Sequence, residues 1–553
     1  MSALRLTSIF YLLPLLGFWL VLIYNLGAQW SVYEQYSYGW AVPILCLYLL
    51  WRNAEMPKSG NAESKKQKAE SPTPSSLPAF QRFNVSAFQI VGLFLLCLLY
   101  APTRFFHEAN PIWRFTSLLW TLEVIGLTLL LLQATHPASP TANHASRLTF
   151  PICFFLVAVP WPSGIETFVI QSLMRLNSAT TVELLGLFGV PALQHGNVIE
   201  VGSGMVGIDE ACSGIRSLQA TLMISLFLGE MYALSAWRRT FCVFAGFALA
   251  FAFNIGRTFL LARVAAAKGV GAVASWHDPA GVTILVTCFL SLWLVARALR
   301  AVESGKQKVE EGGPGSVVSG QWSEVGGPVV RSPVVPLSAV SWSLLAWLLV
   351  VESGTELWYQ SHERATAANL QWSVQHPAQN PSYEEVEIPS NIRGQFLADE
   401  STHARWKDGS GNSWQLYYFR WLPAHSLEKR VAIQLAKTHG PEKCLPAAGM
   451  TLRAYLGIIT VPVAGIQLAL QQYVFSAEGT TLHVFYAIYE DPSGTTELAN
   501  RRKDFPSRVA AALSGSRNYG QRFLEVALIG CERPEDARAA LRSELDKIIK
   551  VER

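Results

Sequence analysis

The sequence predicts a mainly α-helical, polytopic membrane protein that carries an α+β domain after its last span. Half of the 553 residues are hydrophobic and only 15% are charged, a composition typical of membrane proteins. Apolar runs long enough to cross a bilayer recur through residues 1–300. Residues 353–553 instead alternate apolar and polar side chains, as half-buried β-strands do.

About eight spans are expected in residues 1–300, and a ninth tethers the C-terminal domain. The first, Ile9–Leu26, is not followed by a small-residue cleavage site, so we expect a retained span rather than a removed signal peptide. Residues 163–200 are mixed in character and are expected to form an interfacial or re-entrant element. The other predicted spans cover residues 38–51, 87–100, 115–132, 148–161, 214–236, 240–261, 280–295 and 337–351.

Clusters of Lys and Arg predict the topology, because short basic stretches remain on the cytoplasmic side of a membrane. The clusters are residues 52–84, the pair Arg238-Arg239 and residues 300–331. Arg104 and Arg114, in a predicted loop at 102–114, argue for the opposite orientation. The clusters together predict that Cys212, His277 and the C-terminal domain face outward.

The expected organisation follows from the spans and linkers. It comprises a polytopic membrane domain (1–300), a cytoplasmic linker (301–336), a transmembrane span (337–352) and an extracytoplasmic α+β domain (353–553). In the last domain Trp414–Trp421 is a candidate strand, and residues 534–552 have helical periodicity. Ile466–Phe475 and Leu482–Tyr489 are predicted to form a hairpin.

Charge and cysteine content exclude several classes of protein. The formal charge of +4 is small and no strongly basic block is present, so we expect no nucleic-acid partner. The eight cysteines lack paired CxxC spacing, and no HExxH occurs, so neither a metal nor a cofactor is expected. Cys444 and Cys531 would face the oxidising exterior; they form either a disulfide or two unrelated buried thiols.

A polar, glycine-punctuated stretch, Gly207–Ser217, stands directly before the apolar run 214–236. Cys212 falls where this loop becomes a membrane helix, and a thiol there feels the positive end of the helix dipole, which favours the thiolate. Arg216 follows one turn later and adds to the same field, and Glu210 is a second supporting candidate. The alternative for Cys212 is a small apolar residue at a helix start.

Two later spans carry polar residues that are costly in a membrane. Asn254 and Arg257 are three residues apart and share one face of the span 240–261. At about 1.5 Å per residue, Arg257 lies roughly 26 Å along the helix from Thr240, level with Cys212. An intramembrane Arg marks a functional site or a buried pair, unless it reaches the lipid headgroups.

His277 opens the span 280–295, where Asp278 is the expected N-cap and Pro279 the expected first helical residue. Cys212, Arg257 and His277 thus reach one depth from three consecutive spans. They would supply a nucleophile, a cation and a general acid or base. The alternative is an ordinary loop histidine.

At these residues the sequence resembles the exosortase/archaeosortase family. The resemblance rests on Glu210–Ser217, the Asn254-x-x-Arg257 pair and His277-x-x-x-Gly281, and it covers about residues 10–300. It implies Cys212 as the nucleophile, completed by Arg257 and His277. It also implies a multi-pass protein of the bacterial inner membrane, with its site facing the periplasm.

The same resemblance implies partners and substrates. These are exported proteins that end in a sorting tail, made of a Pro-Glu-Pro-type (PEP-type) motif, a transmembrane helix and a basic end. Their cleavage and transfer to an acceptor at the cell envelope would be linked to exopolysaccharide production. His439–Pro446 with Gly449-Met450 is similar to a fused, exosortase-associated exopolysaccharide-biosynthesis domain, to which we assign no chemistry.

Two other classes remain open at this stage. One is a non-catalytic membrane component of polysaccharide assembly or export, held together by buried polar contacts. The other is a polytopic polysaccharide polymerase or ligase, which would be expected to carry large outer loops rich in Arg and His. The loops before Cys212 are modest in size, which disfavours the second class.

Overall fold

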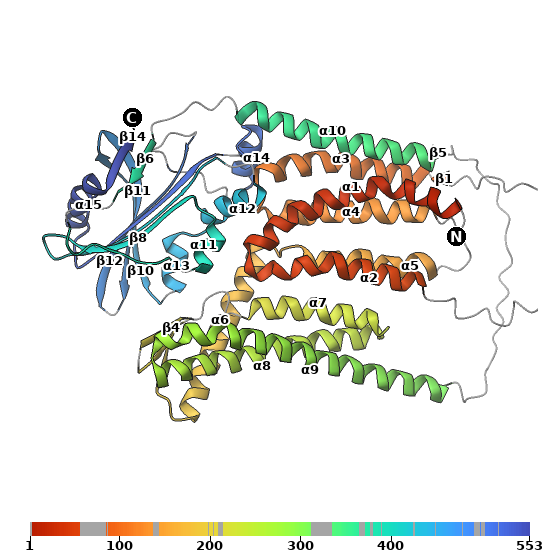
Figure 1. Ribbon diagram of the computed structural model, residues 1–553, viewed down its shortest axis with the longest axis horizontal. Helices are drawn as coiled ribbons and strands as arrows, with labels where there is room; N and C mark the ends of the chain where they lie inside the picture. Colours follow the sequence, from red (N-terminus) through yellow and green to blue (C-terminus); the bar gives the residue numbers. More distant parts are fainter. Residues whose placement is uncertain are drawn as a thin grey trace, which may run out of the picture.

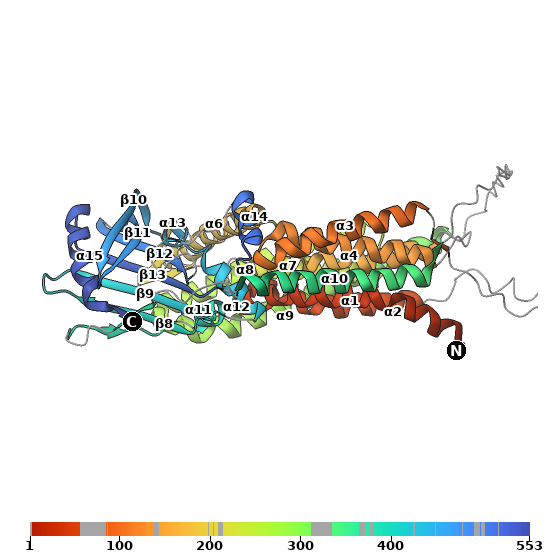
Figure 2. The ribbon, with the colours of Figure 1, turned by 90° about the horizontal axis from the view of Figure 1, so that it is seen from above.

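The structure is a computed structural model, in which helices run side by side and a β-sheet region lies at one end of them (Figures 1 and 2). It describes residues 3–55, 84–85, 87–135, 143–196, 198–202, 204–207, 214–310, 335–363, 371–375, 380–388, 390–423, 426–447, 449–477, 479–491, 498, 504–517 and 519–552. Most of the two predicted linkers therefore lies outside the described residues. Helix α9 continues to Glu310, past the expected linker start at 301.

The apolar runs of the first 300 residues form helices, and one more follows the second linker. The helices are α1 (Ala3–Val32), α2 (Val42–Glu55), α3 (Ala87–Ala109), α4 (Arg114–Thr135), α5 (Asn143–Cys153), α6 (Ser163–Leu187), α7 (Ile215–Met231), α8 (Ala236–Lys268), α9 (Val273–Glu310) and α10 (Leu337–Glu363). Short 3₁₀ helices η1 (Glu34–Ala41), η2 (Phe154–Ala158) and η4 (Val270–Ala272) connect some of them. Figure 1 shows α1–α5 and α10 as one group, with α7, α8 and α9 beside it.

Within the described residues, six helices are long and apolar enough to cross a membrane, or seven if a pair bent by 70° counts as one span. The bent pair is 148–158 with α6, at the position of the expected interfacial or re-entrant element. Helices α2 and α7, of 14 and 17 residues, span about 21 and 26 Å, less than a core of about 30 Å. The fold is that of a polytopic membrane protein, and the count of nine spans stays a prediction.

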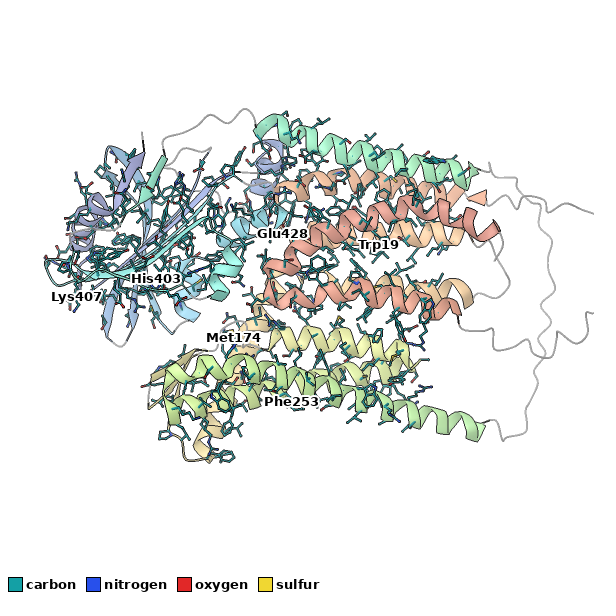
Figure 3. The ribbon with its side chains drawn as sticks, in the orientation of Figure 1. Trp19, Met174, Phe253, His403, Lys407 and Glu428 are labelled. Carbon is teal, nitrogen blue, oxygen red and sulfur yellow. The ribbon has the colours of Figure 1, made fainter. Side chains whose placement is uncertain are left out.

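Aromatic and aliphatic side chains fill the space between the helices, and a few polar groups join them. Phe18 and Leu22 of α1 are fully buried with Trp120 of α4. Trp19, labelled in Figure 3, donates a hydrogen bond of 3.0 Å to the hydroxyl of Thr128. Apolar packing and these polar contacts together fix α1 against α4.

Residues 371–552 contain an antiparallel seven-stranded sheet with the order β10-β11-β12-β13-β9-β8-β7. Its strands are β7 (Glu384–Glu385), β8 (Glu400–Lys407), β9 (Ser413–Trp421), β10 (Thr451–Val463), β11 (Ile466–Ala477), β12 (Thr480–Glu490) and β13 (Gln521–Ile529). A second pair joins β6 (Gln371–Val374) to β14 (Ile549–Glu552). The accompanying helices are α11 (Ser390–Phe396), α12 (Leu427–Ala436), α13 (Pro441–Ala447), α14 (Phe505–Leu513) and α15 (Pro534–Ile548).

The two faces of the sheet separate Cys444 from Cys531. Helix α15 packs on the face that includes Cys531, whereas α12 and α13 cover the opposite face. Cys444 Sγ lies 3.7 Å from His439 Nδ1, and Cys531 Sγ contacts the Arg533 carbonyl. The two sulfurs are not bonded to each other in the structure, and Cys444 is exposed, so it is not the buried thiol of the alternative either. The disulfide stays a prediction.

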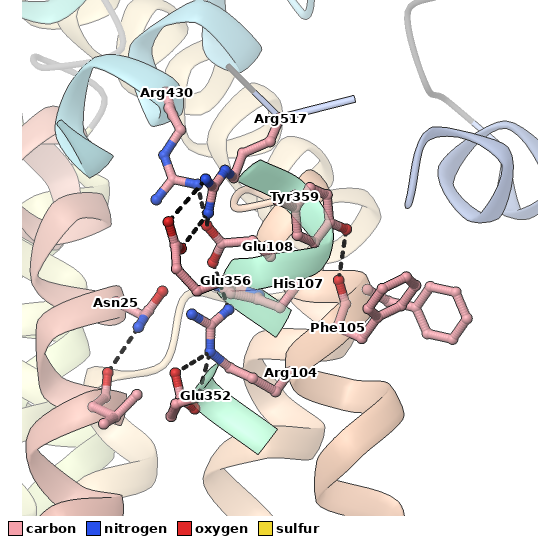
Figure 4. Close-up of polar contacts among 12 residues, drawn as sticks. Asn25, Arg104, Phe105, His107, Glu108, Glu352, Glu356, Tyr359, Arg430 and Arg517 are labelled. Atoms are coloured by element: carbon pink, nitrogen blue, oxygen red, sulfur yellow. Dashed lines mark hydrogen bonds and ion pairs between the residues drawn. The ribbon is translucent and has the colours of Figure 1, made fainter. Parts of the chain in front are cut away.

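An ion-pair network joins the helix bundle to the C-terminal region (Figure 4). Glu108, at the end of α3, is 3% exposed and contacts Arg104 at 2.5 Å and Arg517 at 3.0 Å. Arg430 of α12 pairs with the same carboxylate. Arg517 also reaches Glu356 of α10 at 2.5 Å. The C-terminal region is thus attached to the bundle through buried charges on both sides.

The two arginines that argued against the predicted topology are both buried in such pairs. The expected loop at 102–114 is largely helix, because α3 continues to Ala109 and α4 starts at Arg114. Arg104 pairs with Glu352 at 2.9 Å, and Arg114 donates to the side chain of Gln29 at 2.8 Å. Since neither guanidinium is free to anchor at a membrane surface, neither counts against the orientation.

We predict that Glu108→Gln destabilises the protein, because it leaves buried arginines without their shared counter-charge. Losing one member of a buried pair typically costs about 3–5 kcal/mol. Thermal unfolding of the purified full chain in detergent would measure the change. The control is Glu400→Gln, since the side chain of Glu400 is 48% exposed in its pair with Arg420. Equal melting temperatures for the two variants would contradict the prediction.

Glu525 of β13 should make stability depend on pH. Burial, and then the charge of Glu442, raise the pKa of Glu525 to about 7 from an ordinary value of 4.5. The folded state therefore keeps the proton longer than the unfolded state, and stability falls as pH rises from 4.5 to about 7. By the usual conversion the loss is at most about 3 kcal/mol.

We predict that Glu525→Gln removes this decline, because the amide does not titrate. Unfolding temperatures of the full chain between pH 4.5 and 7.5 would measure it, with Glu385→Gln at an exposed carboxylate as the control. An identical pH slope in wild type and Glu525→Gln would show that the carboxyl is not buried as described.

Candidate active site

The candidate site lies at the end of the bundle that carries the sheet region (Figure 1). A three-stranded sheet, β2 (Ala192–His195), β3 (Val198–Val201) and β4 (Gly204–Gly207), lies there between α6 and α7 in the sequence. Its first turn touches the C-terminal region, since a Cβ added at Gly449 would lie 3.7 Å from the His195 carbonyl oxygen. The site and the C-terminal region are therefore neighbours in space.

Arg257 of α8 and His277 of α9 are in direct contact. Arg257 Nη2 lies 2.8 Å from His277 Nε2, and both side chains are partly buried. A guanidinium has no acceptor atom, so His277 Nε2 must accept this hydrogen bond. The imidazole is consequently neutral in this arrangement, with its proton on Nδ1. The contact therefore fixes one tautomer of His277.

His277 lies inside a helix rather than at its start. Helix α9 begins at Val273 and includes Pro279, so Asp278 and Pro279 are not its N-cap and first residue as expected. The 3₁₀ turn η4 leads directly into α9, so the helix starts well before the expected first residue, Pro279. As a result His277 is held by helix α9, next to α8, instead of by a loop.

Asn254 fixes the start of α7 against α8. Its side chain is 3% exposed, and a Cβ added at Gly214 would lie 2.9 Å from Asn254 Nδ2. Gly214 also has φ +83°, in the left-handed region that favours glycine. Gly281 of α9 likewise lies close to Arg257, because a Cβ added at Gly281 would be 3.5 Å from Arg257 Nη2. Two glycines thus bring three helices together at Asn254 and Arg257.

The structure brings some predicted site residues together and leaves others aside. Cys212 and Glu210 lie outside the described residues, between β4 and α7. Arg216 forms an ion pair of 2.5 Å with Glu34 of η1, and both side chains are about 40% exposed (42% and 41%). An exposed pair of this kind contributes little to the free energy of unfolding, but it joins α7 to η1.

Sequence reasoning missed Glu34, Asn177 and Thr258. Asn177 Nδ2 of α6 donates a buried hydrogen bond of 2.7 Å to Thr258 Oγ1. Thr258 is four residues after Asn254, so the polar face of α8 was visible from helical spacing. Glu34 and Asn177 gave no such signal, because their partners are distant in the sequence.

Arg257 and His277 are thus in contact, and Gly214, which follows Cys212 by two residues in the sequence, lies against Asn254 of the same helix α8. Residues 30–294 match the family described as transmembrane exosortase, and this part of the chain belongs to that family. Exosortases are membrane proteases or transpeptidases that act on sorting signals. No curated protein and no solved structure matches the chain.

The family match ends before the C-terminal region, so the resemblance of that region to an exosortase-associated domain stays a prediction. Across the described parts of the chain, no three His, Cys, Asp or Glu side chains lie together as a metal site would require.

We predict that Gly214→Ala lowers the rate of sorting-signal processing by about 10- to 100-fold, because a displaced α7 start moves reacting groups by around 1 Å. The matched control is Gly256→Ala on α8, where an added Cβ meets nothing within 4 Å. Processing of a tail-bearing reporter by the two variants, at equal enzyme levels, would measure this. Full activity of Gly214→Ala would show that the contact with Asn254 does not position the site.

Proposed function

We propose that this chain is a thiol-dependent transpeptidase or protease. It would cleave the PEP-type sorting signals from exported proteins and transfer the exported proteins to a cell-envelope acceptor, in connection with exopolysaccharide production. The observation that carries the proposal is the 2.8 Å contact between Arg257 and His277, beside the Asn254–Gly214 contact. Cys212 precedes Gly214 by two peptide units, which span at most about 7 Å.

In the first half of the reaction, Cys212 loses its proton to His277 Nε2 and the thiolate attacks the scissile carbonyl. The C–N bond breaks, His277 returns the proton to the leaving amine, and the tail departs. The exported protein stays on Cys212 as a thioester. In the second half, His277 takes a proton from the acceptor nucleophile, which attacks the thioester. The C–S bond then breaks, and His277 returns the proton to the Cys212 thiolate.

Arg257 would stabilise the oxyanion that forms on the attacked carbonyl. Its Nε is buried and has no hydrogen-bond acceptor among the described residues, so a donor is available. When Nη2 turns toward the substrate, His277 Nε2 is released to accept the thiol proton. The same guanidinium would alternatively hold the acidic residue of the sorting motif. Loss of an oxyanion donor typically costs about 10²–10³ in kcat.

The proposed orientation places the site and the C-terminal α+β domain in the periplasm of the bacterial inner membrane. The Arg238-Arg239 pair stands at the start of α8, and Arg257 lies about 28 Å further along the helix at 1.5 Å per residue. This basic pair would remain in the cytoplasm. The burial of Arg104 and Arg114 supports this orientation, since they no longer oppose it.

The test is an immunoblot of a tail-bearing reporter co-expressed with the wild type, Cys212→Ala, Arg257→Ala and His277→Ala. We expect the processed band to disappear with each variant. Cys531→Ala serves as a matched control, because that thiol is free and lies in the sheet region. Membrane levels of each enzyme would be measured on the same blot.

Normal processing by Cys212→Ala would reject the nucleophile. It would favour the alternative of a non-catalytic component of polysaccharide assembly, in which the buried polar residues hold helices together.

A further inference from the structure

Gln219 of α7 is a fully buried amide with unused hydrogen-bonding capacity. It is 0% exposed, and neither its Oε1 nor its Nε2 has a partner among the described residues. An unsatisfied polar group inside an apolar bundle typically costs several kcal/mol. A bound group that supplied a matching donor and acceptor would remove this cost.

The other buried polar residues on α7 have partners. Thr221 Oγ1 donates to the Leu218 carbonyl at 3.0 Å, and Ser225 Oγ donates to the Cys242 carbonyl at 3.4 Å. On α6, which also packs against α8, two more groups resemble Gln219: Asn177 Oδ1 and Thr181 Oγ1 are buried without a partner in the described ranges. Unused donors and acceptors therefore occur on α6 and on α7, two of the helices that pack on α8.

Gln219 lies deeper in the bundle than the reacting groups. Gly214 faces Asn254 and Ser225 faces Cys242, so α7 and α8 are antiparallel. Gln219 is five residues inward from Gly214, and Arg257 is three residues outward from Asn254. At 1.5 Å per residue the two side chains are about 12 Å apart along the bundle. About four residues of extended peptide cover that distance.

We propose that Gln219 binds the peptide backbone of the sorting tail, about four residues to the C-terminal side of the scissile bond. This inference rests on the proposed function and names a subsite of the same reaction. The side-chain amide of Gln219 carries both N–H donors and an acceptor oxygen, which match the C=O and N–H of an extended peptide. A tail that leaves its helix to reach Arg257 carries unpaired backbone groups into the membrane, where they need protein partners.

The direction along the tail follows from depth. The tail enters from the exported protein outside and continues as a transmembrane helix toward the other side. A residue deeper than Arg257 therefore meets the part after the scissile bond.

The test separates a ligand-binding role from a structural one, because the two roles predict opposite combinations. Replacing an unsatisfied buried polar group by an apolar one of similar shape is neutral or stabilising. Gln219→Met should therefore keep or raise the melting temperature, while kcat/KM falls about tenfold, the effect of losing two ordinary hydrogen bonds. The control Thr221→Val, on the same helix, should process at the wild-type rate.

The assay would use the purified full chain in proteoliposomes. Its reporter is a soluble domain followed by a Pro-Glu-Pro motif, a transmembrane helix and a basic end. A second reporter carries Pro four residues after the scissile bond, which removes one backbone N–H. We expect this Pro to slow the wild type but to have no further effect on Gln219→Met, as expected for groups that interact directly.

Three results would decide the matter. Wild-type kcat/KM in Gln219→Met would overturn the proposal, and so would parallel losses of melting temperature and activity. Additive effects of Gln219→Met and the Pro reporter would overturn it as well. A failure of the proposed function has a different sign, which is normal processing by Cys212→Ala. If Cys212→Ala processes normally but Gln219→Met is slow, the nucleophile is rejected while peptide binding at Gln219 is still supported.

Discussion

Polar groups inside an apolar helix bundle must find partners within the protein, and these pairings decide how this chain is arranged. Glu108 joins α3 to the C-terminal region through Arg430 and Arg517. Asn177 joins α6 to α8 in the same way, through Thr258. Because a buried polar group without a partner is costly, each pairing fixes helix position and rotation more strictly than apolar contacts do.

The same constraint sets the chemistry of the candidate site. The Arg257 guanidinium donates a hydrogen bond to His277 Nε2, so the imidazole is neutral and oriented before any substrate arrives. Asn254 and Gly214 hold the start of α7 against the same face of α8. A reaction at this place would therefore begin from groups already in position, and the energy of binding would not be spent on ordering them.

The C-terminal region shares this end of the bundle and is held there from two directions. Glu108 and its arginines attach it on one side. On the other, Gly449 lies next to the turn of His195 in the small sheet that leads toward the site. The C-terminal region therefore borders the helices at both places, and at the second it lies beside the small sheet.

The sequence by itself determined the elements whose signal is local. Apolar runs gave the membrane helices, alternation gave β9 and the β11–β12 hairpin, and spacing put Asn254 and Arg257 on one helix face. Tertiary structure decided what depends on distant partners: Glu34 for Arg216, Gln29 for Arg114, and opposite sheet faces for Cys444 and Cys531. The physical reason is that periodicity records which face of an element is buried, whereas the partner on the facing element is set by packing between segments far apart in the chain.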